Sequence, residues 1–196
     1  MIQQIFKKII VKIIEVEAKM VLKKYQPKIV AVTGSVGKTS TKDAIYTVLS
    51  ESFFTRKSLK SFNSDIGVPL TVLGLPNGWS NPFIWFKNII LGVGLIIFRH
   101  SYPEWLVLEI GADRPGDIKK ITQWIKPDIS VVTKMSSVPV HVEYFSSVDE
   151  VIKEKSYLAK ATKDNGVLIL NSDDDKVSTM ANLTDARKMT YGFIAD

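Results

Sequence analysis

The segment from Val30 to Ser40 constrains the fold of this chain more than any other part of the sequence. It reads Val-Ala-Val-Thr-Gly-Ser-Val-Gly-Lys-Thr-Ser: a short β-branched run enters a glycine-containing loop, and a helix is predicted to begin at Lys38. In such a strand–loop–helix unit, backbone N–H groups and the positive end of the helix point at one anion. The segment therefore predicts a parallel α/β sheet with a phosphate site at its carboxyl edge.

The residue types of this loop suit a nucleoside triphosphate and Mg²⁺. Two glycines allow the backbone to approach phosphate oxygens, Lys38 can neutralise the β- and γ-phosphates, and the Thr39 hydroxyl can ligate Mg²⁺. The predicted nucleotide-binding residues are Thr33, Gly34, Ser35, Val36, Gly37, Lys38, Thr39 and Ser40. The usual spacing has a further glycine at the position of Val32, so a structural glycine turn with an incidental lysine is the alternative.

Short apolar runs alternate with helical stretches along the rest of the chain. Strands are predicted at residues 29–32, 53–55, 105–110, 129–133 and 167–170, and helices from the glycine loop to about residue 50 and over residues 148–161. This pattern is typical of a mostly parallel sheet with helices on both faces. A length of 196 residues is sufficient for one such core.

The formal net charge of +6 lies almost entirely at one end of the chain. Residues 1–28 contain seven lysines and two glutamates, whereas the rest is close to neutral. No nucleic-acid partner is therefore predicted, although the overall charge is basic. The absence of cysteine excludes disulfides, thiolate metal sites and a cysteine nucleophile.

Two segments outside the predicted sheet have the character of surface helices. In residues 2–24, apolar side chains recur at spacings of three and four beside a lysine-rich stripe, and Pro27 ends the pattern. Residues 83–98 are nearly all apolar but shorter than the about 20 residues that cross a bilayer. Residues 2–24 are expected to pack on the domain, with an in-plane membrane anchor or contact with an acidic partner as the alternative. Residues 83–98 are expected to form a buried or interfacial helix, with a transmembrane helix as the alternative. Together the two segments leave association with a membrane surface open. We therefore divide the chain into a basic helix, residues 1–27, and a nucleotide-binding domain, residues 28–196.

Five motifs, in order, make residues 28–196 resemble the central domain of the Mur ligases, the ATP-dependent amide-bond-forming enzymes of peptidoglycan synthesis. They are T-G-S-V-G-K-T-S (33–40), N-S-D-I-G-V-P-L-T (63–71), E-I-G-A-D-R-P-G-D-I (109–118), P-V-H-V-E-Y-F (139–145) followed by Lys155, and L-N-S-D-D (170–174). The second, third and fourth motifs are most similar to the branch that adds D-alanyl-D-alanine to the UDP-N-acetylmuramoyl tripeptide.

The resemblance implies an ATP- and Mg²⁺-dependent ligase that works through an acyl phosphate. Its substrates would be a UDP-sugar peptide and an amino-acid or dipeptide acceptor. The implied catalytic residues are Lys38, Asn63, Glu109, His141 and Lys155. Thr39 and Glu109 would bind one magnesium ion and His141 a second, which a Lys155 carbamylated by CO₂ would ligate or orient.

The same residues allow other interpretations when they are considered without the resemblance. A carboxylate at a strand end, such as Glu109, is as consistent with a salt bridge as with a metal ion. His141 resembles an ordinary loop or core histidine, and Lys155 a solvated residue on a helix. Asp65 competes with Asn63 as the polar group near the γ-phosphate.

Mur ligases resemble one another as three-domain enzymes, and this chain matches only the central domain. Its phosphate loop begins at Thr33, after a single basic helix, and the sequence stops shortly after Gly192. We expect a fragment of a longer ligase, with a natural short phosphate-binding protein as the alternative.

The sequence also allows two other functions. One is a different synthetase of the superfamily, of the folylpolyglutamate or poly-γ-glutamate type. The other is a non-catalytic nucleotide-binding module at a membrane surface. The expected location is the cytoplasm, at the inner face of the membrane if residues 1–24 and 83–98 touch lipid.

Overall fold

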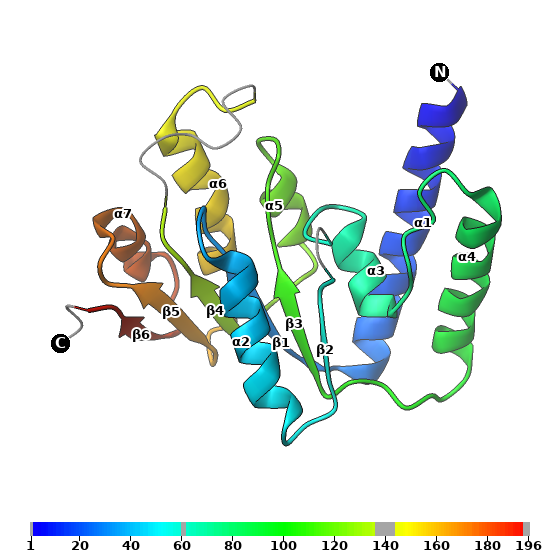
Figure 1. Cartoon of the computed structure of the whole chain (residues 1–196), viewed down its shortest axis with the longest axis horizontal. Coiled ribbons are helices and arrows are strands. Elements are labelled where there is room, and N and C mark those ends of the chain that lie inside the picture. Colours follow the sequence, from blue (N-terminus) through cyan, green and yellow to red (C-terminus); the bar gives the residue numbers. More distant parts are fainter. Residues whose placement is uncertain (1, 60–61, 136–143, 194–196) are drawn as a thin grey trace.

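The computed structural model describes residues 2–59, 62–135 and 144–193, with side chains from residue 8 onward. Within these residues, six strands form one sheet in which all neighbours run parallel (Figure 1). The strands are β1 (Lys28–Thr33), β2 (Thr55–Lys57), β3 (Trp105–Glu109), β4 (Ile129–Val132), β5 (Val167–Asn171) and β6 (Arg187–Tyr191). Their spatial order is β2-β3-β1-β4-β5-β6, which confirms the parallel α/β fold.

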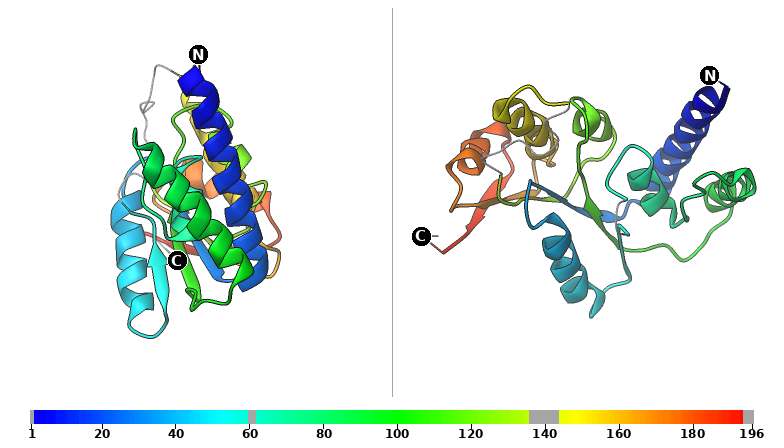
Figure 2. Two further views of the ribbon diagram at one scale, coloured as in Figure 1. Left: turned by 90° about the vertical axis from the view of Figure 1, so that its right-hand side faces the viewer. Right: turned by 45° about the horizontal axis from the view of Figure 1, so that its top comes forward.

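Helices connect the strands and cover both faces of the sheet. They are α1 (Ile2–Tyr25), α2 (Lys38–Ser50), α3 (Gly67–Leu73), α4 (Pro82–Ile97), α5 (Asp117–Ile121), α6 (Val148–Lys160), α7 (Asp175–Ser178) and the 3-10 helix η1 (Thr179–Leu183). Helix α2 lies on one face, and α5 and α6 lie on the other (Figure 2). Helices on both faces are therefore confirmed.

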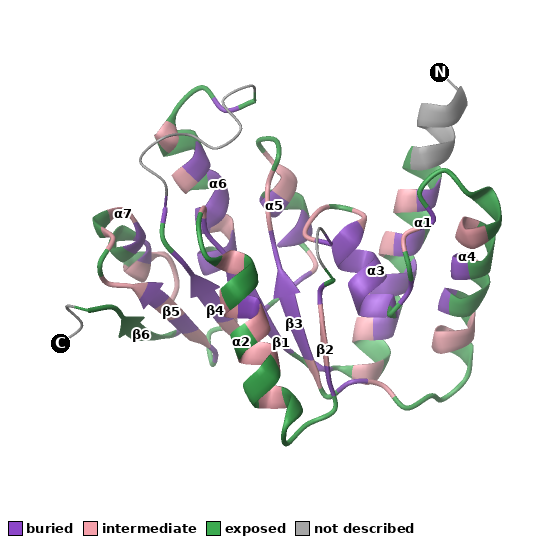
Figure 3. Ribbon diagram, in the orientation of Figure 1, coloured by how far each residue is buried: buried purple, intermediate pink, exposed green. Residues whose placement is uncertain are grey.

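The central strand β1 contributes to two cores because its residues alternate between the faces of the sheet. Val30 and Val32 belong to the core under α2. Ile29 and Ala31 belong to the larger core, which also contains the buried residues of α1, α3 and α5. The interior of the sheet is buried on both sides (Figure 3), which explains why the strand is a continuous apolar run.

The two surface helices expected from the sequence both form and both pack on the domain. Helix α1 contacts α3 and α4 beyond the β2 edge of the sheet, and its Ile14, Ala18 and Val21 are fully buried (Figure 1). Helix α4 begins at a side-chain cap, in which the Asn81 carboxamide accepts hydrogen bonds from the N–H groups of Phe83 and Ile84.

Several elements differ from the sequence prediction. Strand β6 and the short helices α5, α7 and η1 were not predicted. The second strand begins two residues later than expected, at Thr55, because Phe53 and Phe54 lie before the pairing with β3 and are exposed. The Ile-Gly-Val-Pro-Leu-Thr stretch (66–71), for which no helix was predicted, forms most of helix α3, which runs from Gly67 to Leu73. All seven residues of α3 are buried, so the stretch shows no amphipathic period that could indicate a helix.

Candidate nucleotide-binding site

The loop between β1 and α2 holds two glycines in backbone conformations that side chains rarely adopt. Gly34 has a φ of +143°, and a Cβ at this position would lie 1.9 Å from Oγ1 of Thr133. Gly37 has a φ of +83° and caps α2, with open space where its Cβ would be. One glycine thus permits close packing of the loop on the end of β4, and the other leaves the start of α2 accessible.

Part of the loop backbone is already hydrogen-bonded to the segment that follows β4. The N–H groups of Ser35 and Val36 donate to the carbonyl oxygen of Lys134, at 2.9 and 3.2 Å. The N–H groups at the start of a helix have no partner within that helix. Accordingly, the amides of residues 37–40 are the ones that can face a phosphate group, supported by the positive end of α2.

Glu109 is the last residue of strand β3, and several polar side chains of the site contact its carboxylate. Its Oε2 accepts a hydrogen bond from the Thr39 hydroxyl at 2.9 Å. The Asn63 amide lies 3.4 Å from Oε1, and Nζ of Lys42 lies 3.8 Å from Oε2. The Glu109 N–H donates to Ser58 Oγ at 3.1 Å, which fixes the end of the strand. The structure therefore brings together three residues that the sequence analysis selected: Thr39, Asn63 and Glu109.

Lys42 was missed by the sequence analysis. It sits four residues after Lys38 on α2 and is only 2% exposed. A buried ammonium is costly without an anionic partner, and two carboxylates meet that requirement: Asp43 at 3.5 Å and Glu109 at 3.8 Å. In the sequence Lys42 looks like a solvated helix residue, so only the contact with Glu109 in the folded chain shows that it belongs to the site.

Lys155 reaches the phosphate loop from helix α6. Its ammonium donates to the Gly34 carbonyl oxygen at 2.9 Å, and the residue is 6% exposed. Burial, and next the positive charge of Lys38, lower the pKa of Lys155 to about 8, against the opposing effect of Glu154. A solvated helix position is therefore excluded for Lys155.

Lys38 is the first residue of α2 and is partly buried. Its Nζ donates to the Ser35 carbonyl oxygen at 3.3 Å. Burial lowers the pKa of Lys38, and the charge of Glu109 acts in the opposite direction. Lys38 and Lys155 thus present two ammonium groups to one loop, an arrangement that suits a multiply charged anion.

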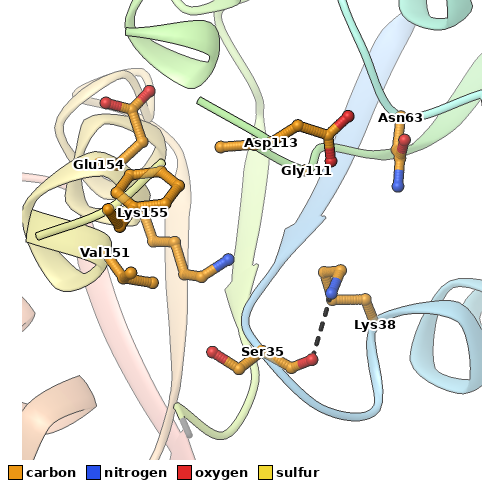
Figure 4. A pocket seen from close by; sticks show the side chains of 10 residues that line it. Ser35, Lys38, Asn63, Gly111, Asp113, Val151, Glu154 and Lys155 are labelled. Carbon is orange, nitrogen blue, oxygen red and sulfur yellow. Dashed lines mark hydrogen bonds between the residues drawn. The ribbon is translucent and has the colours of Figure 1, made fainter. Parts of the chain in front are cut away.

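A pocket at the carboxyl edge of the sheet lies between Lys38, Asn63 and Lys155 (Figure 4). Its polar lining comprises Ser35, Lys38, Asn63, Asp113, Glu154 and Lys155. Glu154, a second residue that the sequence analysis missed, accepts hydrogen bonds from the N–H groups of Gly116, Ile118 and Lys119. Its carboxylate therefore holds the start of α5 against α6 and shapes the wall of the pocket.

The donor atoms of the site fit one magnesium ion bound together with a nucleotide. The Thr39 hydroxyl and the Glu109 carboxylate are adjacent oxygen donors, which Mg²⁺ prefers, and phosphate oxygens and water usually complete such a site. Among the residues that the structure describes, no three His, Asp or Glu side chains lie close enough to hold a metal by themselves. His141, the expected ligand of a second ion, lies outside the described residues.

The parallel sheet, the glycine loop and the helix that starts at Lys38 define a phosphate-binding α/β domain. Residues 32–85 and 88–196 match the model of the Mur ligase middle domain. The chain belongs to this family.

Curated relatives and solved structures agree with that assignment. The UDP-N-acetylmuramoyl-tripeptide–D-alanyl-D-alanine ligase of Bacillus subtilis is 29% identical over 175 residues, which are 89% of this chain and 32% of the relative. The ligase of the same name from Mycobacterium leprae is 33% identical over 159 residues, 81% of this chain and 26% of the relative. The MurF ligase of Thermotoga maritima in complex with ADP shares the fold with a TM-score of 0.72 at 24% identity, over 95% of this chain and 37% of that one. The chain thus spans about a third of the length of these relatives.

Proposed function

We propose that the chain is the ATP-binding part of a ligase that adds D-alanyl-D-alanine to a UDP-N-acetylmuramoyl peptide. The contact between Thr39 and Glu109 carries the proposal, because it joins the phosphate loop to a carboxylate at the edge where ligands of parallel sheets bind. The names of the relatives from B. subtilis and M. leprae support the choice of substrates, and we favour them over folylpolyglutamate or poly-γ-glutamate substrates.

The proposed reaction requires two anions to approach each other. The terminal phosphoryl group of ATP passes to a substrate carboxylate, giving an acyl phosphate, and the acceptor amine then displaces phosphate to form the amide. Lys38 and the amides of residues 37–40 would offset the repulsion in the first step. Asn63, which lines the pocket beside Glu109, would contact the terminal phosphate, whereas Asp65 is exposed.

We propose Thr39 and Glu109 as ligands of the magnesium ion, which supplies Lewis-acid stabilisation of phosphate charge. Lys155 would act as a carbamate, with His141 as its partner at a second magnesium ion. The burial that lowers the pKa of Lys155 to about 8 supports this role, because only the neutral amine reacts with CO₂. As an ammonium, Lys155 has no lone pair for a metal.

We further propose that the protein works in the cytoplasm, where ATP and UDP-sugars are available, and that residues 1–24 and 83–98 make a peripheral membrane contact. No helix in the described part of the chain combines the length and the apolar character needed to cross a bilayer. An amphipathic helix lying at the surface is the form of contact that agrees with this.

The choice of substrate can be tested by measuring phosphate release from ATP with different carboxylate compounds. We expect the UDP-N-acetylmuramoyl tripeptide to stimulate release and a folylglutamate to leave it unchanged. Stimulation by the folylglutamate alone would assign the chain to the other branch. Binding of ATP without release in any mixture would favour a nucleotide-binding module over a chain that turns over ATP by itself.

A further inference from the structure

Helices α1 and α4 each expose a stripe of large apolar side chains. The stripe on α1 consists of Ile9, Ile13, Val16 and Met20, and the stripe on α4 consists of Phe83, Phe86, Ile90, Val93 and Ile97. Within each stripe the spacing is three or four residues, so its members share one face of the helix. Their exposed fractions run from 36% at Ile13 to 81% at Phe83. A contiguous apolar surface of this kind marks an interaction site.

The two helices are fixed to each other as a parallel pair (Figure 2). A Cβ on Gly92 would lie 2.2 Å from a carboxylate oxygen of Glu17, so the middle of α1 touches the middle of α4. At the far end, the Lys24 ammonium donates to carbonyl oxygens of Leu95, Ile96 and Phe98, which end α4. These contacts set the rotation of each helix about its own axis.

Both stripes point to the same side of the pair. Glu17 faces α4 at Gly92, so each of these two residues marks the direction from its own helix toward the other. At about 100° per residue around the helix axis, the α1 stripe is rotated roughly 70° from Glu17, away from the buried residues Ile14 and Ala18. Around the axis of α4, the centre of the α4 stripe is rotated about 140° from Gly92, in the sense opposite to the rotation from Glu17 to the α1 stripe. For parallel helices viewed along their axes, these two rotations bring the stripes onto one shared face. We call this surface, made of the nine residues above, the α1/α4 face.

The surroundings of the α1/α4 face are basic. Lys8, Lys12 and Lys23 are exposed along the outer edge of the α1 stripe. Neither acidic residue of α1 is free at the surface: Glu15 pairs with Lys12 and Lys19, and Glu17 is buried. Residues 66–103, which include α4, contain Lys87 and Arg99 and no acidic residue. An apolar band with a lysine edge and no accessible free carboxylate complements a surface that is apolar inside and anionic outside.

A second copy of the chain fits this face less well than a lipid surface does. Symmetric pairing of two such faces would bring two lysine edges together without intervening acidic groups, and like charges in an interface are unfavourable. Anionic lipid head groups would neutralise the same lysines, while the apolar side chains enter the boundary of the acyl chains.

We propose that α1 and α4 form a single lipid-binding face that lies in the plane of a membrane rich in anionic lipids. This inference rests on the membrane contact proposed above. It adds that the two helices act as one surface and that anionic head groups are required.

Flotation of the whole chain with vesicles tests the inference. One set of vesicles contains phosphatidylcholine alone, and the other contains phosphatidylcholine with phosphatidylglycerol. The α1 variant is Lys8→Gln/Lys12→Gln/Lys23→Gln, with Lys120→Gln/Lys153→Gln/Lys188→Gln as its charge-matched control on other exposed lysines. The α4 variant is Phe86→Gln/Ile90→Gln/Val93→Gln, with Val48→Gln/Phe54→Gln/Leu59→Gln as its control on other exposed apolar residues. Circular dichroism and ATP binding verify that each variant is folded.

We expect the wild-type chain to float with the anionic vesicles and much less with the neutral ones. Both test variants should lose on the order of 10²-fold in lipid partitioning, and both controls should behave as wild type. Equal flotation with neutral vesicles, or normal flotation of the α4 variant, would contradict the shared anionic face while leaving a membrane contact intact. No flotation of the wild type would contradict the membrane contact itself. A self-association abolished by the α4 variant, without lipid binding, would assign the face to a second copy.

Discussion

The Thr39 hydroxyl donates a hydrogen bond to Oε2 of Glu109 over 2.9 Å. This contact joins the first turn of α2 to the carboxyl end of β3, two elements far apart in the sequence. It also places two oxygen ligands side by side next to the loop amides that can hold phosphate. The assignment of a magnesium ion to this site depends on this pair.

Replacing Thr39 with valine should weaken the effect of magnesium on ATP binding. Valine keeps the shape of the side chain but removes the hydroxyl that we assign as a metal ligand. We expect the gain in ATP affinity on adding Mg²⁺ to fall by about tenfold or more, on the scale of one lost charge-assisted contact. Calorimetric titration with and without Mg²⁺ measures this gain. Thr39→Ser should retain it, and a full magnesium effect in the valine variant would disprove the ligand assignment.

Lys155 should form a carbamate more readily than an ordinary lysine. Its pKa of about 8 leaves roughly a tenth of the amine neutral at pH 7, against well under 0.1% for a lysine near pKa 10.5. With ¹³C-bicarbonate, an NMR carbamate signal should appear, increase between pH 7 and 9, and vanish in Lys155→Arg. Lys120, which is exposed, provides the comparison, since Lys120→Arg should keep the signal. A signal unaffected by Lys155→Arg would assign it elsewhere.

Gly34→Ala should damage both the fold and the phosphate loop. The new Cβ would meet Oγ1 of Thr133 at 1.9 Å, in a backbone conformation with φ of +143°. We expect a loss of about 1–3 kcal/mol in the free energy of unfolding and a loss of ATP affinity. Gly94→Ala is the control: it lies within α4 with open space around its Cβ position and should stabilise by up to about 1 kcal/mol. Similar urea midpoints for the two variants would contradict the packing described for the loop.

Glu17 should make the stability of the protein fall as the pH rises. Burial raises its pKa from 4.5 to about 7, so the folded state binds a proton that the unfolded chain releases between these values. The contribution of Glu17 is fully present below pH 4.5 and is lost as the pH passes 7.

We therefore expect Glu17→Gln to exceed wild type in free energy of unfolding at pH 8, by on the order of 2–3 kcal/mol, with the difference shrinking toward pH 4.5. Urea unfolding at several pH values measures it. The exposed Glu51 is the control, because Glu51→Gln should show a flat difference. A flat difference for Glu17→Gln as well would mean that its carboxyl is not perturbed by burial.

Much of the fold was predictable because its elements have clear local patterns. Continuous apolar runs marked the central strands, and the three-and-four spacing marked α1. The limits arise where burial is complete or the element is short. Helix α3 is buried on all sides and therefore shows no period, and β2 is a three-residue edge strand whose Arg56 and Lys57 do not resemble a core strand.

The site also contains residues that the sequence predicted and residues that it could not predict. The loop from Thr33 to Ser40 was visible as a motif, and Glu109 stood out as a carboxylate at a strand end. Lys42 was not predictable, because its importance lies in a contact with a residue far away in the sequence. The burial of Lys155 likewise comes from docking of α6 on the phosphate loop, which no local pattern records.

The most direct test of the account is ATP binding and turnover by Lys38→Ala, with Lys120→Ala as a control on an exposed lysine. Lys38 is the cation that we place on the β- and γ-phosphates, and removal of one such group costs on the order of 10²–10³ in rate. We predict that the wild type and Lys120→Ala bind Mg·ATP and release phosphate in the presence of the UDP-N-acetylmuramoyl tripeptide, whereas Lys38→Ala releases none above background. Near-normal phosphate release by Lys38→Ala would contradict the assignment of this loop as the ATP site.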